Sequence, residues 1–254
     1  MIIKGGDWFV DAAIWIAKIT GLPTFIIGAT VVSVATTLPE LIVSANASLK
    51  GSPEMAIGNA IGSTICNIGL ISAIGIYFVP HAVDRITFGK KGAIMIGAAL
   101  LLIITAWDLT LTKFEALALV AIMILYIVVN LRMLKHRPEP LDGDDDEGLR
   151  ERKTVMINLA KFVAGAGAIV FGAEQLVNNG EIIARLLGVP EGIIALTLIA
   201  LGTSLPELTT TVSSIRKGDG SIGVGNIIGA NILNIALILS TSSFLSPGGL
   251  PMTT

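Results

Sequence analysis

The stretch that decides the fold is Thr36-Thr37-Leu38-Pro39-Glu40, because it returns 167 residues later as Thr203-Ser204-Leu205-Pro206-Glu207. The same offset, without a gap, aligns Gly58-Asn59-Ala60-Ile61-Gly62 with Gly225-Asn226-Ile227-Ile228-Gly229, and Asn67 with Asn234. Self-similarity at a fixed spacing is the sequence signature of an internal repeat. The sequence therefore predicts two halves of one design, each with a glutamate inside its motif.

The composition around these motifs is that of a membrane protein. Of 254 residues, 53% are hydrophobic and only 14% are charged, against roughly 25% charged residues in soluble domains. Residues 55–80, 92–107 and 221–254 contain no Asp, Glu, Lys or Arg. About 20 apolar residues cross a bilayer as a helix, and unpaired backbone groups are not tolerated in lipid. We therefore expect an all-α polytopic membrane protein, since the alternation of a membrane barrel is missing.

Hydropathy predicts eight transmembrane helices joined mostly by short loops. They are expected near residues 3–19, 23–49, 55–79, 90–107, 113–134, 154–186, 190–215 and 221–246. The acidic segment 135–153 is the exception among the loops, and its composition is typical of an aqueous linker. The predicted organisation is thus a first repeat half at 1–134, the linker at 135–153 and a second repeat half at 154–254.

The distribution of lysine and arginine predicts the orientation in an inner or plasma membrane. Twelve of these residues fall in the odd-numbered predicted loops and three in the even-numbered ones. Because positive residues accumulate on the cytoplasmic side, we expect the N-terminus outside and the linker in the cytoplasm. The offset spans five helices, so the halves cross the membrane in opposite directions. This is an inverted-topology repeat, which predicts broken helices and a binding site near the midplane.

The two glutamates are the chemically unusual feature of these helices. Between Pro23 and Leu49, Glu40 is the only charged residue. An unpaired carboxylate there costs roughly 2.5–3.5 kcal/mol, and Lys161, near a helix end, is the only cation expected inside a span. Glu40 and Glu207 are therefore expected either to stay protonated or to meet a bound cation.

Neutral oxygens surround both glutamates in the sequence. The proline before each glutamate frees helix carbonyls, and broken transporter helices use such carbonyls as cation ligands. An all-oxygen set with two carboxylates suits Ca²⁺, which takes 6–8 oxygens, whereas Cys66 is alone and no Cys/His set exists for zinc. The expected metal ligands are Glu40, Glu207, Thr36, Thr203, Thr37, Ser204, Asn67, Asn234 and Ser63.

Other polar residues have plainer interpretations. Asn59 and Asn226 are expected to hold helices together, and Asp7 and Glu174, at equivalent positions near span ends, to be structural or to line a vestibule. The acidic run at 142–147 departs from the EF-hand pattern, because Glu147 stands where that loop needs glycine. We interpret it as a solvated part of the linker.

The paired motifs resemble the two α-repeats of the cation/calcium exchanger superfamily, which includes the sodium/calcium exchangers of archaea. The resemblance runs from Gly5 to about Leu239. It implies a secondary antiporter that exchanges Ca²⁺ for Na⁺, or for H⁺, by alternating access. It also implies Glu40 and Glu207 as the central shared ligands, with backbone oxygens near Ser33 and Ala200.

Three departures from the family pattern leave the coupling ion and the helix number open. Sodium exchangers of this type usually carry Asp at the position of Asn234 and often Ser at that of Ala230, whereas proton-coupled members tend to have Asn at the first. The family typically has ten helices and eight are predicted here, so we expect the second half to lack the last ones. Whether the chain forms a homo-oligomer is also left open.

Several function classes are disfavoured. No nucleotide-binding motif is present, so the ion gradient rather than ATP would drive exchange. A cation channel would usually build its filter from a symmetric oligomer, not from a duplication within one chain. No His lies in a predicted span, so we expect no enzyme, and we expect no organic cofactor. No basic patch predicts nucleic acid binding, which leaves membrane lipids and transported cations as partners.

Overall fold

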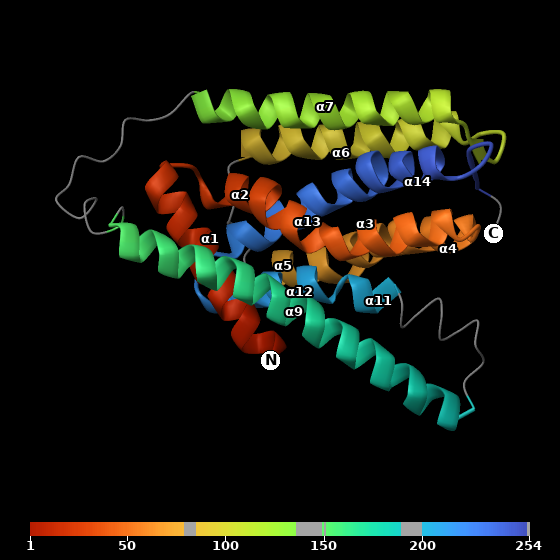
Figure 1. The fold of residues 1–254 in the computed structure, drawn as a ribbon. Helices are drawn as coiled ribbons and strands as arrows, with labels where there is room; N and C mark the ends of the chain where they lie inside the picture. The colour runs from red at the N-terminus through yellow and green to blue at the C-terminus, as the bar shows by residue number, and fades with distance from the viewer. Residues whose placement is uncertain (79–84, 136–148, 150, 189–199, 253–254) are drawn as a thin grey trace.

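The computed structural model describes residues 1–78, 85–135, 149, 151–188 and 200–252, and in this part the chain is helical apart from two short strands (Figure 1). Its α-helices are α1 (Ile2–Thr20), α2 (Thr24–Ile27), α3 (Ser33–Leu49), α4 (Pro53–Cys66), α5 (Ser72–Phe78), α6 (Arg85–Thr105), α7 (Lys113–Lys135), α9 (Arg152–Leu186), α11 (Ala200–Thr203), α12 (Leu205–Arg216), α13 (Gly220–Leu233) and α14 (Leu239–Leu245). Three π-helical turns lie between them, namely η1 (Gly28–Val32), η2 (Asn67–Ile71) and η4 (Asn234–Ile238). Strands β1 (Thr110–Leu111) and β2 (Leu250–Pro251) pair antiparallel.

Six helical stretches among the described residues are long and apolar enough to cross a membrane. They begin at Thr24, Pro53, Arg85, Lys113, Arg152 and Gly220. Helix α1 forms as predicted but carries Lys4, Asp7, Asp11 and Lys18, and it is not among the six. Of the predicted helix at 190–215, residues 190–199 lie outside the described part, as do 136–148 and 150 of the predicted linker.

The internal repeat is confirmed by the element boundaries. Helix α3 begins and ends 167 residues before the unit made by α11 and α12, and the run α4–η2–α5 matches α13–η4–α14 boundary for boundary. The turn glycines follow the same rule, because Gly51 and Gly218 both have φ of 76°. That left-handed conformation favours glycine, so both halves make the same turn for the same reason. Residues 167 positions apart are called repeat equivalents below.

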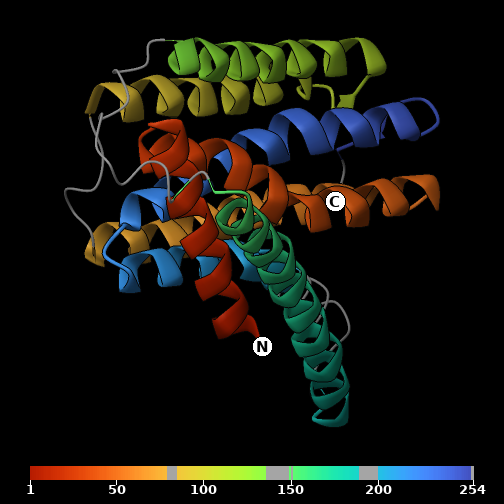
Figure 2. The same ribbon diagram turned by 60° about the vertical axis from the view of Figure 1, so that its left-hand side comes forward.

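The helices form layers around α13 (Figures 1 and 2). Helices α6 and α7 lie side by side on one face, and α1 and α9 cross on the other. Between them, nearly every residue of α13 is buried, and α13 contacts η1, α2, α3 and α12. Gly28 and Gly225 make this contact close, because a Cβ at Gly225 would collide with the Phe25 carbonyl and one at Gly28 with the Ile222 carbonyl. Small residues of this kind let membrane helices approach each other.

The two proline motifs differ in how the helix is interrupted. In the second half, α11 ends at Thr203 and α12 begins at Leu205, so the break falls at Ser204. In the first half, α3 continues through Pro39, and the irregular turn is η1, which ends at Val32. Pro39 still lacks an N–H, which frees the carbonyl four residues earlier. The second motif therefore lies at a helix break, whereas the first lies within a continuous helix.

Lys91 is counted among the positive residues of the predicted loops, and this assignment is wrong. The residue lies inside α6 with its side chain fully buried, so Lys161 is not the only lysine within a span. Its Nζ lies 5.3 Å from the centre of the Phe25 ring and 5.8 Å from that of Tyr126. Two aromatic faces stabilise an ammonium that has left water. The Tyr126 hydroxyl in turn donates to the carbonyl of Ala29 in η1.

The contact of α13 with α2 generates a prediction. Gly225→Ala should lower the free energy of unfolding by roughly 1–3 kcal/mol, because the new methyl group collides with backbone atoms of Phe25 and Ala29 that cannot move freely. The measurement is the midpoint of thermal unfolding in detergent micelles. Its repeat equivalent, Gly58→Ala, is the matched control, since no described atom lies within 4 Å of a Cβ there. Equal losses of stability in the two variants would contradict the conclusion that the close contact at position 225 requires glycine.

Candidate ion-binding site

Glu40 and Glu207 meet inside the bundle where α3 packs against α12. Each is only 1% exposed, so both carboxyl groups are shielded from solvent. They are also close enough to repel each other electrostatically. The repeat thus brings residues 167 positions apart close together, which the predicted shared site requires.

Two symmetric hydrogen bonds tie the halves together at this point. Thr36 donates to Oδ1 of Asn226 at 3.0 Å, and its equivalent Thr203 donates to Oδ1 of Asn59, also at 3.0 Å. Thr203 further shares a 3.0 Å hydrogen bond with Ser63. Thr36 also lies within hydrogen-bonding reach of the Glu207 carboxylate. These contacts place three predicted ligands, Thr36, Thr203 and Ser63, at the interface of the two repeats.

Asn59 has a larger role than the sequence suggested. Its Nδ2 donates to the backbone carbonyl of Glu40 at 3.1 Å and to Ser44 at 2.8 Å, while its Oδ1 accepts from Thr203. Asn59 therefore positions two groups: the backbone that carries the Glu40 carboxylate, and the Thr203 hydroxyl of the other half. The Gly-Asn-x-x-Gly motif was the available signal, but its contact with Thr203 depends on how the halves fold together.

Buried oxygen atoms without a partner mark the remaining predicted ligands. Among the described residues, three pairs of repeat equivalents have such an oxygen in both members: Thr37 and Ser204, Glu40 and Glu207, and Asn67 and Asn234. Unpaired buried oxygens also occur singly, without an unpaired equivalent in the other half, at Ser48, Asn130, Thr211, Asn231, Ser242 and Ser246. The Cys66 thiol lies next to Ser204 and is a weak hydrogen-bond partner for it. Buried polar atoms are normally hydrogen-bonded, so unpaired atoms in symmetric pairs call for a ligand. Asn67 and Asn234 each begin a π-helical turn, which places both amides at an irregular point of the backbone.

The arrangement fits a hard cation better than any other ligand. Two buried carboxylates without a cationic partner are expensive in a low-dielectric interior, and a bound cation removes that cost. In the described residues no three side chains of His, Cys, Asp or Glu gather. A bound metal ion would thus be held by two carboxylates and neutral oxygens, a set that suits Ca²⁺ or Na⁺ rather than zinc.

Comparison with known proteins shows the family of the chain. The model of the sodium/calcium exchanger protein family matches residues 1–132 and 157–253, which is most of the chain. The chain therefore belongs to the sodium/calcium exchanger family of membrane antiporters. The family is one of transporters and not of enzymes.

Individual relatives span nearly the whole chain. The sodium/calcium exchanger MaX1 of Methanosarcina acetivorans is 34% identical over a match 282 positions long. The match covers 97% of this chain and 80% of that protein. The inner membrane protein YrbG of Escherichia coli K12 is 32% identical over 252 residues, 98% of this chain and 78% of that one. A structure of the sodium-calcium exchanger NCX_Mj soaked with Na⁺ and Sr²⁺ superimposes with a TM-score of 0.84 at 30% identity, over 99% of this chain and 80% of that chain. The predicted fold class and family resemblance are confirmed.

The hydrogen bonds of Asn59 lead to a prediction for stability. Asn59→Ala should lower the free energy of unfolding by roughly 2–3 kcal/mol, because three hydrogen bonds inside the membrane bundle are lost together. Thermal unfolding in detergent micelles measures the effect. Asn158→Ala is the control, since Asn158 makes one local hydrogen bond, to the Thr154 carbonyl. A loss at position 59 no larger than at position 158 would show that Asn59 does not tie the halves together.

Proposed function

We propose that the chain exchanges Ca²⁺ for Na⁺ across the membrane by alternating access. The observation that carries the proposal is the set of three equivalent pairs with unpaired buried oxygens, centred on Glu40 and Glu207. Two negative carboxylates match the charge of one Ca²⁺. Calcium and the counter-ion compete for the same oxygens, so each leaves only when the other can replace it. Exchange follows from that exclusive occupancy.

The inverted repeat supports alternating access. Because the halves have opposite topology, exchanging their conformations turns a state open to one side into a state open to the other. Under the proposal, residues 1–134 and 154–254 are the two repeat halves, and 135–153 joins them in the cytoplasm. The excess of Lys and Arg in the odd-numbered loops supports that orientation, with the N-terminus outside. The odd-numbered loops keep their excess of positive residues when the buried Lys91 is left out of the count.

Asn234 favours a second candidate, a proton-coupled calcium antiporter. This neutral amide stands where related sodium exchangers usually have a carboxylate, and Ala230 stands where they often have a hydroxyl. Both residues are buried, at the end of α13 and the start of η4. Fewer oxygens and less negative charge would weaken Na⁺ binding and leave protons to neutralise the glutamates.

Transport in liposomes tests the function directly. The purified chain reconstituted into liposomes should take up ⁴⁵Ca²⁺ when Na⁺ is concentrated inside, because outward flow of Na⁺ drives inward flow of Ca²⁺. Protein-free liposomes are the control. A parallel assay replaces the Na⁺ gradient by a pH gradient of equal driving force. Uptake with the pH gradient alone would select the proton-coupled alternative, and uptake with neither would reject both.

Charge removal at the site tests the assigned ligands. Glu40→Gln and Glu207→Gln should each reduce calcium uptake at least about tenfold, since each removes half of the negative charge that faces the ion. Glu54→Gln is the matched control, because Glu54 is exposed in the first turn of α4. Calcium binding by calorimetry in detergent should fall in parallel. Normal binding in both site variants would rule out the shared pair as the calcium ligands.

A further inference from the structure

The two access routes to the site differ in this structure. Helix α1 and the second half of α9 are repeat equivalents, and so are α12 and most of α3. The contact of α1 with α12 therefore corresponds to that of α9 with α3. The first contact is closed, and the second holds a cavity of about 360 Å³. The cavity is lined by Pro39, Ile42, Val43, Val170, Ala173, Glu174, Asn178, Gly202, Thr203 and Pro206.

This cavity extends from one side to Thr203, one of the predicted ligands of the ion site. Thr203 and Pro206 in its wall belong to the motif of Glu207, and Pro39 to the motif of Glu40. On the closed side, the equivalent of Val43 is Thr210, which is fully buried. The equivalent of Ile42 is Thr209, and a Cβ on Gly6 of α1 would lie 2.7 Å from its methyl carbon. Glycine at position 6 thus permits a close contact on one side, where its equivalent Ala173 borders open space on the other.

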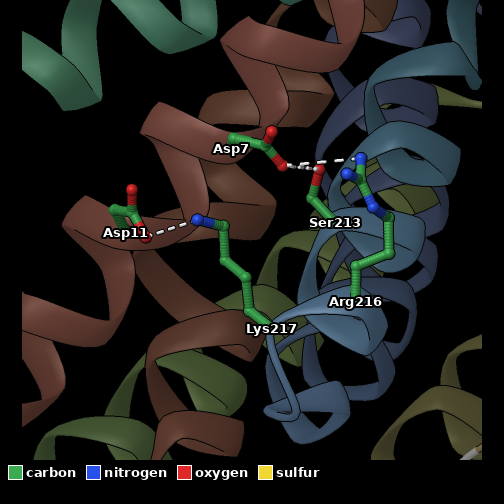
Figure 3. Close-up of polar contacts among 5 residues, drawn as sticks. All are labelled: Asp7, Asp11, Ser213, Arg216 and Lys217. Atoms are coloured by element: carbon green, nitrogen blue, oxygen red, sulfur yellow. Dashed lines mark hydrogen bonds and ion pairs between the residues drawn. The ribbon is translucent and has the colours of Figure 1, made fainter.

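Charged side chains hold the closed side together (Figure 3). Lys217 donates to Asp11 at 2.5 Å, and Ser213 donates to Asp7 at 3.2 Å. Arg216 approaches the same Asp7 oxygen at 3.8 Å. Both acids lie on α1 one turn apart, and both cations lie where α12 ends. The group Asp7, Asp11, Arg216 and Lys217 is called the α1–α12 latch below.

The latch has only half of a counterpart in the other repeat. The equivalents of Asp7 and Lys217 are Glu174 and Lys50, so an acid and a cation are retained. The equivalents of Asp11 and Arg216 are Asn178 and Leu49, which cannot form the same ion pairs. If the halves exchange conformations, the newly closed side lacks both pairings that the present closed side has.

We propose that the α1–α12 latch biases the exchanger toward the state in which the ion site faces the cavity between α3 and α9. The inference rests on the alternating access proposed above. It adds that the latch determines the relative populations of the two states when no ion is bound. The ion pairs are partly exposed, with side-chain exposures of 58% for Arg216 and 42% for Asp11. Such pairs are weak, so the bias is small enough for ion binding to reverse it.

Cysteine labelling tests the bias without transport. The background is Cys66→Ala, because Cys66 is the only cysteine. A reporter is placed at Ile42→Cys in the cavity or at its equivalent Thr209→Cys on the closed side. Labelling rates with a charged thiol reagent are measured in nanodiscs, where both faces of the protein are accessible.

Two opposite changes should have the same effect on the reporters. Asp11→Asn removes a pair from the present closed side, and Asn178→Asp supplies the missing partner of Lys50 on the other. Each should raise the labelling rate at position 209 about threefold, the effect of one exposed ion pair on the minor state. Labelling at position 42 should fall slightly, since the major state loses little of its population. Exchanging the charges, Asp11→Lys with Lys217→Asp, should restore the original rates.

The controls separate this inference from the proposed function. Asn179→Asp adds the same charge beside position 178 and should leave both reporters unchanged. Unchanged labelling at position 209 in both Asp11→Asn and Asn178→Asp would overturn the latch, even if a sodium gradient drives calcium uptake in the same preparation. If both substitutions raise that labelling but neither gradient drives uptake, the latch stands and the exchange proposal fails.

Discussion

The whole structure depends on two acidic side chains that are close enough to repel each other and are shielded from solvent. Glu40 and Glu207 are each 1% exposed, and three of their four oxygens have no hydrogen-bond partner. The buried Lys91 does not neutralise them, because it stacks between the Phe25 and Tyr126 rings. Such an arrangement is stable only when charge arrives from outside the chain. The buried acidic pair lowers stability when no positive charge is bound. For the same reason the site favours ligands that carry positive charge.

The repeat solves the geometric part of this problem. Hydroxyl donors of Thr36 and Thr203 are used up between the halves, on Asn226 and Asn59, and fix how the two motifs face each other. Acceptors such as Asn67 and Asn234 are left free. A hydroxyl that donates its hydrogen keeps lone pairs on its oxygen, so Thr36 and Thr203 remain available as the ligands that the sequence predicts. A hydrogen bond between the halves therefore costs the ion none of its predicted ligands.

Much of the fold was predictable because the repeat is written in the sequence without gaps. Helix ends and turn glycines recur at the offset of 167, because similar residues in similar packing environments end their helices at equivalent positions. The site residues could be listed for the same reason. Lys91 could not be placed, because its burial depends on Phe25 and Tyr126, which are distant in sequence and meet it only after folding. Asn59 was predicted to hold helices together, but its hydrogen bond with Thr203 could not be predicted for a similar reason. The uninterrupted α3 shows that a proline motif alone does not fix where a helix breaks.

The halves are most alike where the ion would bind and least alike where they meet α1 and α9. The Thr-x-Leu-Pro-Glu motif and the Asn67 and Asn234 pair are shared, whereas Gly6 and Asp11 correspond to Ala173 and Asn178. Equal ligands make the site equivalent from either side of the membrane. Unequal packing around the site gives the two open states different free energies, so one is more populated than the other. Under the proposed exchange, ion recognition and the resting direction of access are therefore set by separate residues. Substitutions in the outer helices would then shift the resting direction without altering ion recognition.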